Sequence, residues 1–114
     1  MFGHERFTAY QYSIEFLSLA LKLLTKLPRG NAYMSDQLKR AAMSVPLNLA
    51  EGSGKKSQID KIRFYTIARG SAMECAAACD VILLIDPRLE KDVFIAKSKL
   101  EEVTKILTAI CYKK

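Results

Sequence analysis

The sequence predicts an all-α protein, and three observations support this prediction. Apolar residues recur at alternating intervals of three and four over long stretches, which is the spacing of one face of an α-helix. Half of the residues are hydrophobic and 26% are charged, a composition typical of a globular domain rather than of a disordered chain. Only five glycines and three prolines are present, too few for the many turns of an all-β fold. We therefore expect long helices joined by short turns.

The first helix is expected over residues 8–26, where two apolar lines run side by side. The main line has the spacing of a helix that packs lengthwise on its neighbours and consists of Phe7, Tyr10, Ile14, Leu17, Leu21 and Leu24. The flanking line consists of Phe16, Ala20, Leu23 and Leu27. Because a helix in a small bundle needs only one buried face, the second line predicts contact beyond one protomer. Pro28 and Gly30 should then end this helix.

The second helix is expected over residues 34–51, with Pro46 in its interior. Proline removes one backbone hydrogen bond and clashes with the carbonyl four residues earlier, here that of Ala42, so a kink is expected. Gly52 and Gly54 should end the helix. A stripe of polar residues lies beside the apolar line of this helix, displaced from it by one residue around the helix axis. It consists of Gln37, Arg40, Ser44, Asn48 and Glu51.

The third helix is expected to begin at Ser57 and to reach residue 84. The Ser57 hydroxyl should cap the following amides, with Asp60 as the acidic partner of a capping box. The second half of this helix is apolar around its whole circumference except at Asp80, which predicts burial on every side. Three other helices of a small protomer cannot comfortably cover that surface, and the excess predicts an oligomer.

The fourth helix is expected from residue 88 or 89 to residue 112, after a turn in which Asp86 is the cap and Pro87 occupies the first helical position. Its apolar line has the same alternating spacing and consists of Val93, Ala96, Leu100, Val103, Leu107 and Ile110. Four helices with short connections predict an antiparallel, up-and-down four-helix bundle. A chain of 114 residues without linkers or repeats is expected to form a single domain over residues 1–114.

The cysteines and the apolar segments indicate the compartment. Cys75, Cys79 and Cys111 are odd in number and lie inside apolar helical patterns, which favours free thiols in a reducing compartment. Three thiolates without a fourth ligand would form an incomplete soft-metal site, so we favour packing as small hydrophobes and expect no cofactor. No signal peptide is recognised, and no apolar run approaches the ~20 residues of a membrane span. We expect a cytoplasmic protein without a membrane partner.

An enzymatic function is not expected from this sequence. The only histidine is His4, near the terminus, so a serine or cysteine nucleophile would lack its usual base. The segment GSGKKS at 52–57 follows a helix rather than a strand and lacks the length of a phosphate-binding loop. The polar stripe also lacks a credible acid and base pair.

The polar stripe has two interpretations. It could form a pocket that grips a ligand or an RNA base. The alternative, which we favour, is a buried structural network between the second and third helices, because buried charge is tolerated only when it is paired. This network would fix helix register or subunit geometry, and its members would be Arg40, Asn48, Glu51 and Glu74.

The basic residues predict a polyanionic partner. The formal net charge is +6 and the pI is about 9.3. A basic group is expected at one end of the hairpin formed by the second and third helices and consists of Lys39, Lys55, Lys56, Lys61 and Arg63. These residues could be a solvated, lysine-rich hinge. We favour a phosphate-binding patch that positions nucleic acid without reading its sequence, because the charges cluster and a symmetric oligomer would multiply them. Phe64 and Tyr65, although nearby, are expected in the core.

The middle of the sequence resembles a known family. The resemblance rests on Gln37, Arg40, Ala41, Ser44, Asn48, Ala50, Glu51 and Gly52, followed by Phe64, Ile67, Ala68, Gly70, Ser71 and Glu74. These residues are similar to those of bacterial four-helix-bundle proteins encoded by intervening sequences in 23S ribosomal RNA genes. That family in turn resembles the accessory variability proteins of diversity-generating retroelements. The intervening-sequence group is the nearer match because this chain is less basic than a typical accessory variability protein.

The resemblance implies a homopentamer, a barrel of bundles with a central channel and a basic surface. For the accessory variability proteins it also implies binding to nucleic acid and to a reverse transcriptase, and it does not imply an enzyme. We therefore expect a non-catalytic nucleic-acid-binding protein, with RNA as the expected ligand and a reverse transcriptase as a candidate partner. The pentamer should form through the second apolar faces of the first and third helices. The alternative is an oligomeric protein-interaction scaffold with an incidental basic patch.

Overall fold

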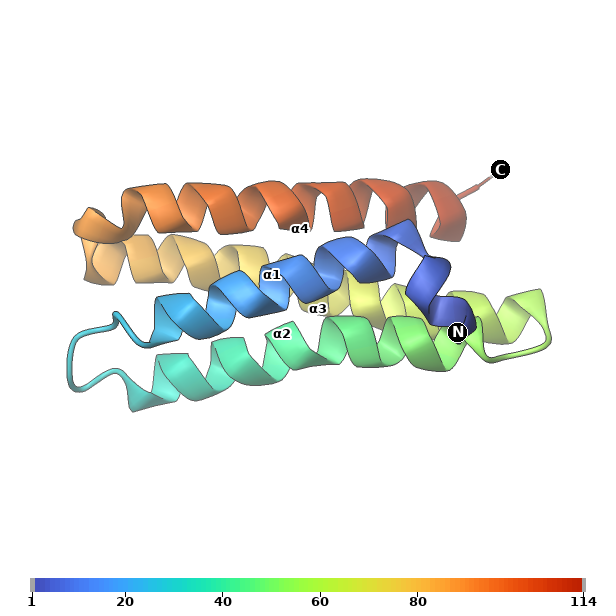
Figure 1. Ribbon diagram of the computed structural model, residues 1–114, viewed down its shortest axis with the longest axis horizontal. Helices are drawn as coiled ribbons and strands as arrows, with labels where there is room; N and C mark the ends of the chain where they lie inside the picture. The colour runs from blue at the N-terminus through green and yellow to red at the C-terminus, as the bar shows by residue number, and fades with distance from the viewer. Residues whose placement is uncertain (1, 114) are drawn as a thin grey trace.

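The computed structural model describes residues 2–113 as an antiparallel bundle of four long helices (Figure 1). These are α1 (Thr8–Leu24), α2 (Ala32–Ser53), α3 (Gln58–Ile85) and α4 (Glu90–Cys111), with the short 3-10 helices η1 (Gly3–Arg6) and η2 (Pro87–Leu89). No strand occurs among the described residues. The all-α prediction is confirmed, and each long helix begins and ends within two residues of its expected bounds.

The chain runs up and down the bundle, so the α2–α3 turn lies at the same end as both termini (Figure 1). The α1–α2 loop and the α3–α4 turn lie at the opposite end. The described residues extend over 45 × 26 × 22 Å. We call the end that holds η1 and the α2–α3 turn the hinge end, and the segment 51–63 around that turn the hinge.

The side-chain caps predicted for the helix starts are present at the turns. Ser57 Oγ accepts a hydrogen bond from the Asp60 amide at 3.1 Å, which caps α3. Asp86 Oδ1 accepts from the Arg88 amide at 3.1 Å and begins η2 before α4. Gly30, in the α1–α2 loop, has a φ of 89°, a conformation that side chains disfavour.

The inward face of α1 differs from the expected one. The buried residues of this helix are Ala9, Ser13, Phe16, Ala20 and Leu23. Ile14 and Leu21, from the line expected to be the main seam, are 41% and 42% exposed. The flanking line therefore faces the core, and Ala9 and Ser13 continue it toward the start of the helix. Periodicity alone does not distinguish two apolar lines.

The second half of α3 is not buried on every side within one chain. Cys75, Cys79 and Ile82 are buried, but Met73 is half exposed and Leu84 is 83% exposed. The three neighbouring helices cover only part of the circumference of α3. Some of its apolar surface therefore remains exposed on a single protomer, as predicted. In the described part of the chain, no helix is long and apolar enough to cross a membrane.

Candidate nucleic-acid interface

The hinge is a short turn that exposes lysines between two helix ends. After α2 ends at Ser53, the Gly54 amide bonds back to the carbonyls of Ala50 and Glu51, and the Lys55 amide bonds to the carbonyl of Gly52. These bonds satisfy the last carbonyl groups of the helix. The chain then reaches the Ser57 cap within a few residues, so Lys56 is held at the exposed tip.

The hinge contains two ion pairs, both on the surface. Lys55 Nζ lies 3.9 Å from Glu51 Oε2 and 5.2 Å from the centre of the Phe64 ring. Arg63 Nη1 lies 3.7 Å from Asp60 Oδ1. Exposed pairs at such distances contribute little, and their cations remain available to another anion.

Lys61 joins α3 to the last turn of α2. Its ammonium group donates a hydrogen bond to the Ser53 carbonyl oxygen at 3.1 Å. The Tyr65 hydroxyl, one turn further along α3, lies 3.2 Å from Ser53 Oγ. An open hollow of about 330 Å³ lies over these groups and is lined by Gly3, Arg6, Phe7, Ser53, Lys61 and Tyr65. We call it the hinge hollow.

The expected basic group divides into two parts. Lys55, Lys56, Lys61 and Arg63 gather at the hinge, whereas Lys39 lies about 20 Å along the α2 axis from Ser53. The expectation that Lys39 belongs to the same end of the hairpin is therefore wrong. A helix rises 1.5 Å per residue, so even one face of α2 spreads its charges over much of the bundle length.

The predicted buried network is also absent within the described chain. Arg40, Glu51 and Glu74 are exposed, and Glu51 pairs with Lys55 instead. The stripe lies at the edge of the α2–α3 contact, where long charged side chains reach water. The polar contact that does form is smaller: Ser44 Oγ lies 2.8 Å from Ser71 Oγ, and the Asn48 amide nitrogen donates to the Ser44 carbonyl at 2.8 Å.

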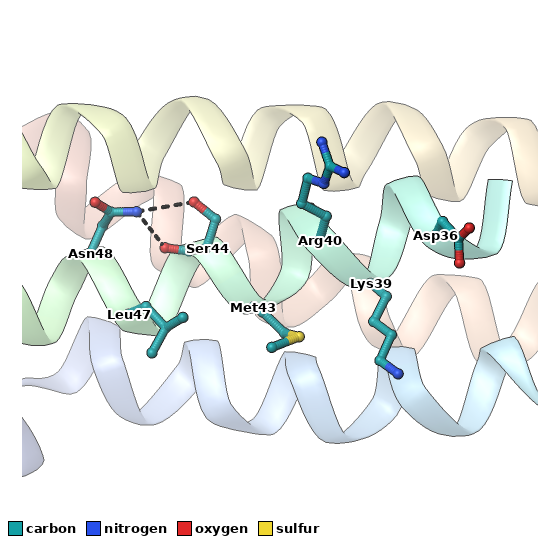
Figure 2. Close-up of a pocket in the computed structure, with 7 residues that line it drawn as sticks. All are labelled: Asp36, Lys39, Arg40, Met43, Ser44, Leu47 and Asn48. Carbon is teal, nitrogen blue, oxygen red and sulfur yellow. Dashed lines mark hydrogen bonds between the residues drawn. The ribbon is translucent and has the colours of Figure 1, made fainter. Parts of the chain in front are cut away.

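A second hollow, of about 500 Å³, lies along the outer face of α2. Figure 2 shows Lys39 and Arg40 pointing to opposite sides of this helix, with Met43 and Leu47 further along it on the side of Lys39. The complete lining is Asp36, Lys39, Arg40, Met43, Ser44, Leu47 and Asn48. Its apolar centre and mixed charges suit a protein surface better than a phosphate backbone.

The cysteines pack as small hydrophobes. Cys75 and Cys79 are fully buried, and Cys111 is half-buried. Burial raises the pKa of the Cys75 thiol to about 12 and that of Cys79 to about 11, so both remain protonated at neutral pH. Among residues 2–113, no group of three or more histidine, cysteine or acidic side chains is arranged to hold a metal ion.

A model of the 23S rRNA-intervening sequence protein family matches residues 5–109. The chain belongs to this family. The fold of the chain is similar to that of a crystallised protein of unknown function from the S23 ribosomal protein family of Bacteroides thetaiotaomicron. The TM-score is 0.83 at 22% sequence identity, over 93% of this chain and 99% of that one. No curated protein matches the sequence.

Two residues that line the hinge hollow were not predicted from the sequence. Arg6 reaches the hinge hollow although some 50 residues separate it from Ser53 in the chain. Tyr65 is buried, as expected, but its hydroxyl lines the hollow. The one available signal was Gly52, because a glycine within a helix often marks the close approach of another group.

Proposed function

We propose that this protein is an oligomeric, non-catalytic nucleic-acid-binding protein that contacts phosphates through its hinge. The observation that carries the proposal is the convergence of Lys55, Lys56, Lys61 and Arg63 on one end of the bundle, with only weak surface pairing. Phosphate contacts of this kind position nucleic acid and supply most of its non-specific affinity. We assign Lys39, on the outer face of α2, to a nucleic-acid contact that is separate from the hinge.

RNA is the ligand we propose, rather than DNA. The family name refers to intervening sequences of 23S rRNA, and the similar Bacteroides protein is described as belonging to a ribosomal protein family. The function we propose is non-catalytic, and the single histidine, His4, packs against two aromatic rings. The His4 ring lies 5.8 Å from the Phe2 ring and 4.7 Å from the Tyr10 ring, between centres.

Charge reversal at the hinge tests this function. We expect Lys55, Lys56 and Arg63, changed together to Glu, to weaken binding of a structured RNA and to flatten its dependence on salt. The slope of log affinity against log salt should fall by about 0.7 to 0.9 for each lost phosphate contact. Fluorescence anisotropy at several salt concentrations measures both quantities, with duplex DNA as the comparison ligand.

The matched control carries the same change in charge at the opposite end of the bundle, where Lys22, Arg29 and Lys91 are exposed. Their replacement by Glu should leave the slope within about 0.7 of the unmodified protein, because no phosphate contact is lost. Equal losses in both triple variants would mean that net charge, and not the hinge, governs binding. RNA affinity unchanged in the hinge variant would contradict the proposal.

We further propose a homopentamer, the assembly that the resemblance implies. Apolar side chains exposed on α1 and α3, such as Leu21, Met73 and Leu84, support an interface between copies. Light scattering should give five times the 12.8 kDa chain mass. Leu21→Asp together with Met73→Asp should lower that mass, whereas Tyr33→Asp, at an exposed position on α2, should not.

A reverse transcriptase is the protein partner that we would test first, because accessory variability proteins resemble this family. Co-sedimentation with a purified retroelement reverse transcriptase, with and without RNA, tests this partnership. Association that persists without RNA would support a direct protein contact. Association lost on ribonuclease treatment would argue against one.

The α2 hollow favours a second function, that of an oligomeric protein-interaction scaffold with an incidental basic patch. Met43 and Leu47 provide an apolar centre, and Asp36 and Arg40 provide charges at its margin. An interface of this composition should depend weakly on salt, in contrast to phosphate binding. Leu47→Asp should abolish binding of such a partner and leave RNA affinity unchanged.

A further inference from the structure

The hinge hollow lies where η1, the last turn of α2 and the first turns of α3 meet. Of the expected nucleic-acid contacts, it includes only Lys61. Arg6 comes to it from the N-terminal segment η1, and Ser53 and Tyr65 add two hydroxyl groups. The hollow is therefore a site with its own chemistry, distinct from the exposed lysines at the tip of the hinge.

Packing fixes the Tyr65 hydroxyl at the hollow. The side chain is on a residue only 7% exposed, and its ring centre lies 5.2 Å from that of Phe7. On another side the ring lies against Gly52, where a Cβ atom would come within 2.7 Å of Tyr65 Cε1. A ring held in this way places its hydroxyl group without further loss of entropy when a ligand arrives.

The groups around the hollow have more hydrogen-bond donors than they use. Tyr65 and Ser53 share one hydrogen bond, so one of their two hydroxyl protons remains available. The Lys61 ammonium group has three N–H donors, and one is directed to the Ser53 carbonyl. The Arg6 guanidinium group adds five more. Such a surplus of donors suits a ligand rich in acceptors.

No carboxylate neutralises the two cations of the hollow. Within residues 2–113, neither Arg6 nor Lys61 has a carboxylate oxygen within 4.0 Å, whereas Lys55 and Arg63 each have one. Two cations that line one hollow without a carboxylate partner favour an anion with more than one negative charge. A phosphate monoester carries a charge of about −1.5 to −2 at neutral pH and has three strong acceptor oxygens.

We propose that the hinge hollow binds the terminal phosphate of a nucleic-acid strand. The proposal rests on the proposed function and deepens it, since it assigns Lys61 to an end-recognising site and leaves the backbone contacts to Lys55, Lys56 and Arg63. Arg6 and Lys61 supply the charge, and the hydroxyl pair of Ser53 and Tyr65 supplies an additional donor. The phosphodiester backbone, with one charge per phosphate, matches the two cations less well.

The test compares three oligoribonucleotides of one sequence, with a 5′-phosphate, a 3′-phosphate or no terminal phosphate. We expect the unmodified protein to bind one phosphorylated form about tenfold more tightly than the unphosphorylated form, as suits hydrogen bonds to a charged group. Arg6→Gln and Lys61→Met should each abolish this preference. Tyr65→Phe keeps the ring that packs on Phe7 and should reduce the preference about threefold.

Lys56→Gln is the matched control, because Lys56 is an exposed cation of the hinge outside the hollow. It should weaken binding of all three oligoribonucleotides equally and leave the tenfold preference intact. Circular dichroism and thermal unfolding establish that each variant folds. Equal affinity of the unmodified protein for all three forms overturns the proposal, as does a preference that survives in Arg6→Gln and Lys61→Met.

Inorganic phosphate, followed by ³¹P NMR, separates failure of this proposal from failure of the proposed function. Oligoribonucleotide binding with a steep salt slope but no end preference would overturn the phosphate-end site and leave the nucleic-acid function standing. Binding of inorganic phosphate that Arg6→Gln abolishes, without any oligoribonucleotide binding, would overturn both strand-end recognition and the nucleic-acid function. The hollow would then be a site for a free phosphate compound.

Discussion

The α2–α3 turn and the α3–α4 turn both connect antiparallel helices, but their charged side chains are paired differently. Each joins two antiparallel helices and begins the second part with a side-chain cap, Ser57 in one case and Asp86 in the other. At the α3–α4 turn the charges fasten the chain. Asp86 is buried and pairs with Arg88 at 3.0 Å, and Asp92, just beyond, pairs with Lys26 of the α1–α2 loop at 2.8 Å.

In the α2–α3 turn, most of the positive charge is not neutralised by close ion pairs. Segment 51–63 contains four basic residues and two acidic ones, and its ion pairs are long and exposed. A neutral Ser57 hydroxyl performs the capping that a carboxylate performs at the other turn. A turn can therefore be held mainly by backbone and cap hydrogen bonds while most of its basic side chains remain weakly paired.

The largest expected effect on stability tests how tightly the hinge end is packed. Gly52→Ala places a methyl group against the Tyr65 ring, and we expect it to reduce the free energy of unfolding. Gly70→Ala, in an exposed position on α3 with no atom within 4 Å of the added Cβ, should increase it. The two variants should differ by about 2 kcal/mol in urea unfolding. Equal stabilities would show that Tyr65 moves freely and that the hollow is not preformed.

An intermediate effect is expected at the cap of α3. Ser57→Ala removes the acceptor for the Asp60 amide and should cost about 1 kcal/mol in the free energy of unfolding. Because a hydroxyl group does not titrate, this cost should be the same at pH 7 and pH 4. Ser57→Asp, which keeps an acceptor, is the control and should recover most of the stability at pH 7. A Ser57→Ala variant as stable as the unmodified protein would mean that the turn is held elsewhere.

The smallest effect is expected at the cap of the other turn, where pH is the variable. The hydrogen bond from the Arg88 side chain lowers the pKa of Asp86 below its ordinary value. A carboxyl group with a lowered pKa in the folded state stabilises above its unfolded pKa of about 3.9, and the contribution is lost as pH falls through the folded value. Asp86→Asn should therefore be slightly less stable at pH 7, and the difference should shrink as pH falls below about 3.9 and disappear below the lowered pKa of the folded state. A difference that grows on acidification would contradict the assigned pairing.

Much of the fold could be predicted because it depends on local signals. Helix bounds follow from apolar spacing, from Ser57 and Asp86 as caps, and from the glycines and prolines between them. The inward face of α1 could not be predicted, since two lines shared the same spacing. Ala9, Ser13 and Ala20 are buried together with the large Phe16 and Leu23, and which line packs inward is decided only when the neighbouring helices are in place.

The site was predicted less completely than the fold. Lysines of the hinge could be recognised because they are near one another in the sequence, and their position at one end follows from a tight turn. Lys39 was wrongly assigned to the same end of the hairpin, because its positive charge was taken as a sign that it lies near the other basic residues. Arg6 and the Tyr65 hydroxyl could not be found, because only the packed bundle brings η1 to the end of α2. Arg40 and Glu74 were expected in a network that needs burial, and the single chain leaves both exposed.

The α2–α3 hairpin has a consequence for the order of folding. These two helices contact each other more extensively than any other pair, and a short turn joins them, so little loop entropy opposes their association. The α1–α4 contact, by contrast, must bring together the first and the last long helix of the sequence. We expect the hairpin to form in the folding transition state and α4 to dock afterwards. Substitutions at Gly52 should then slow folding, whereas core substitutions in α4, such as Leu107→Ala, should mainly accelerate unfolding.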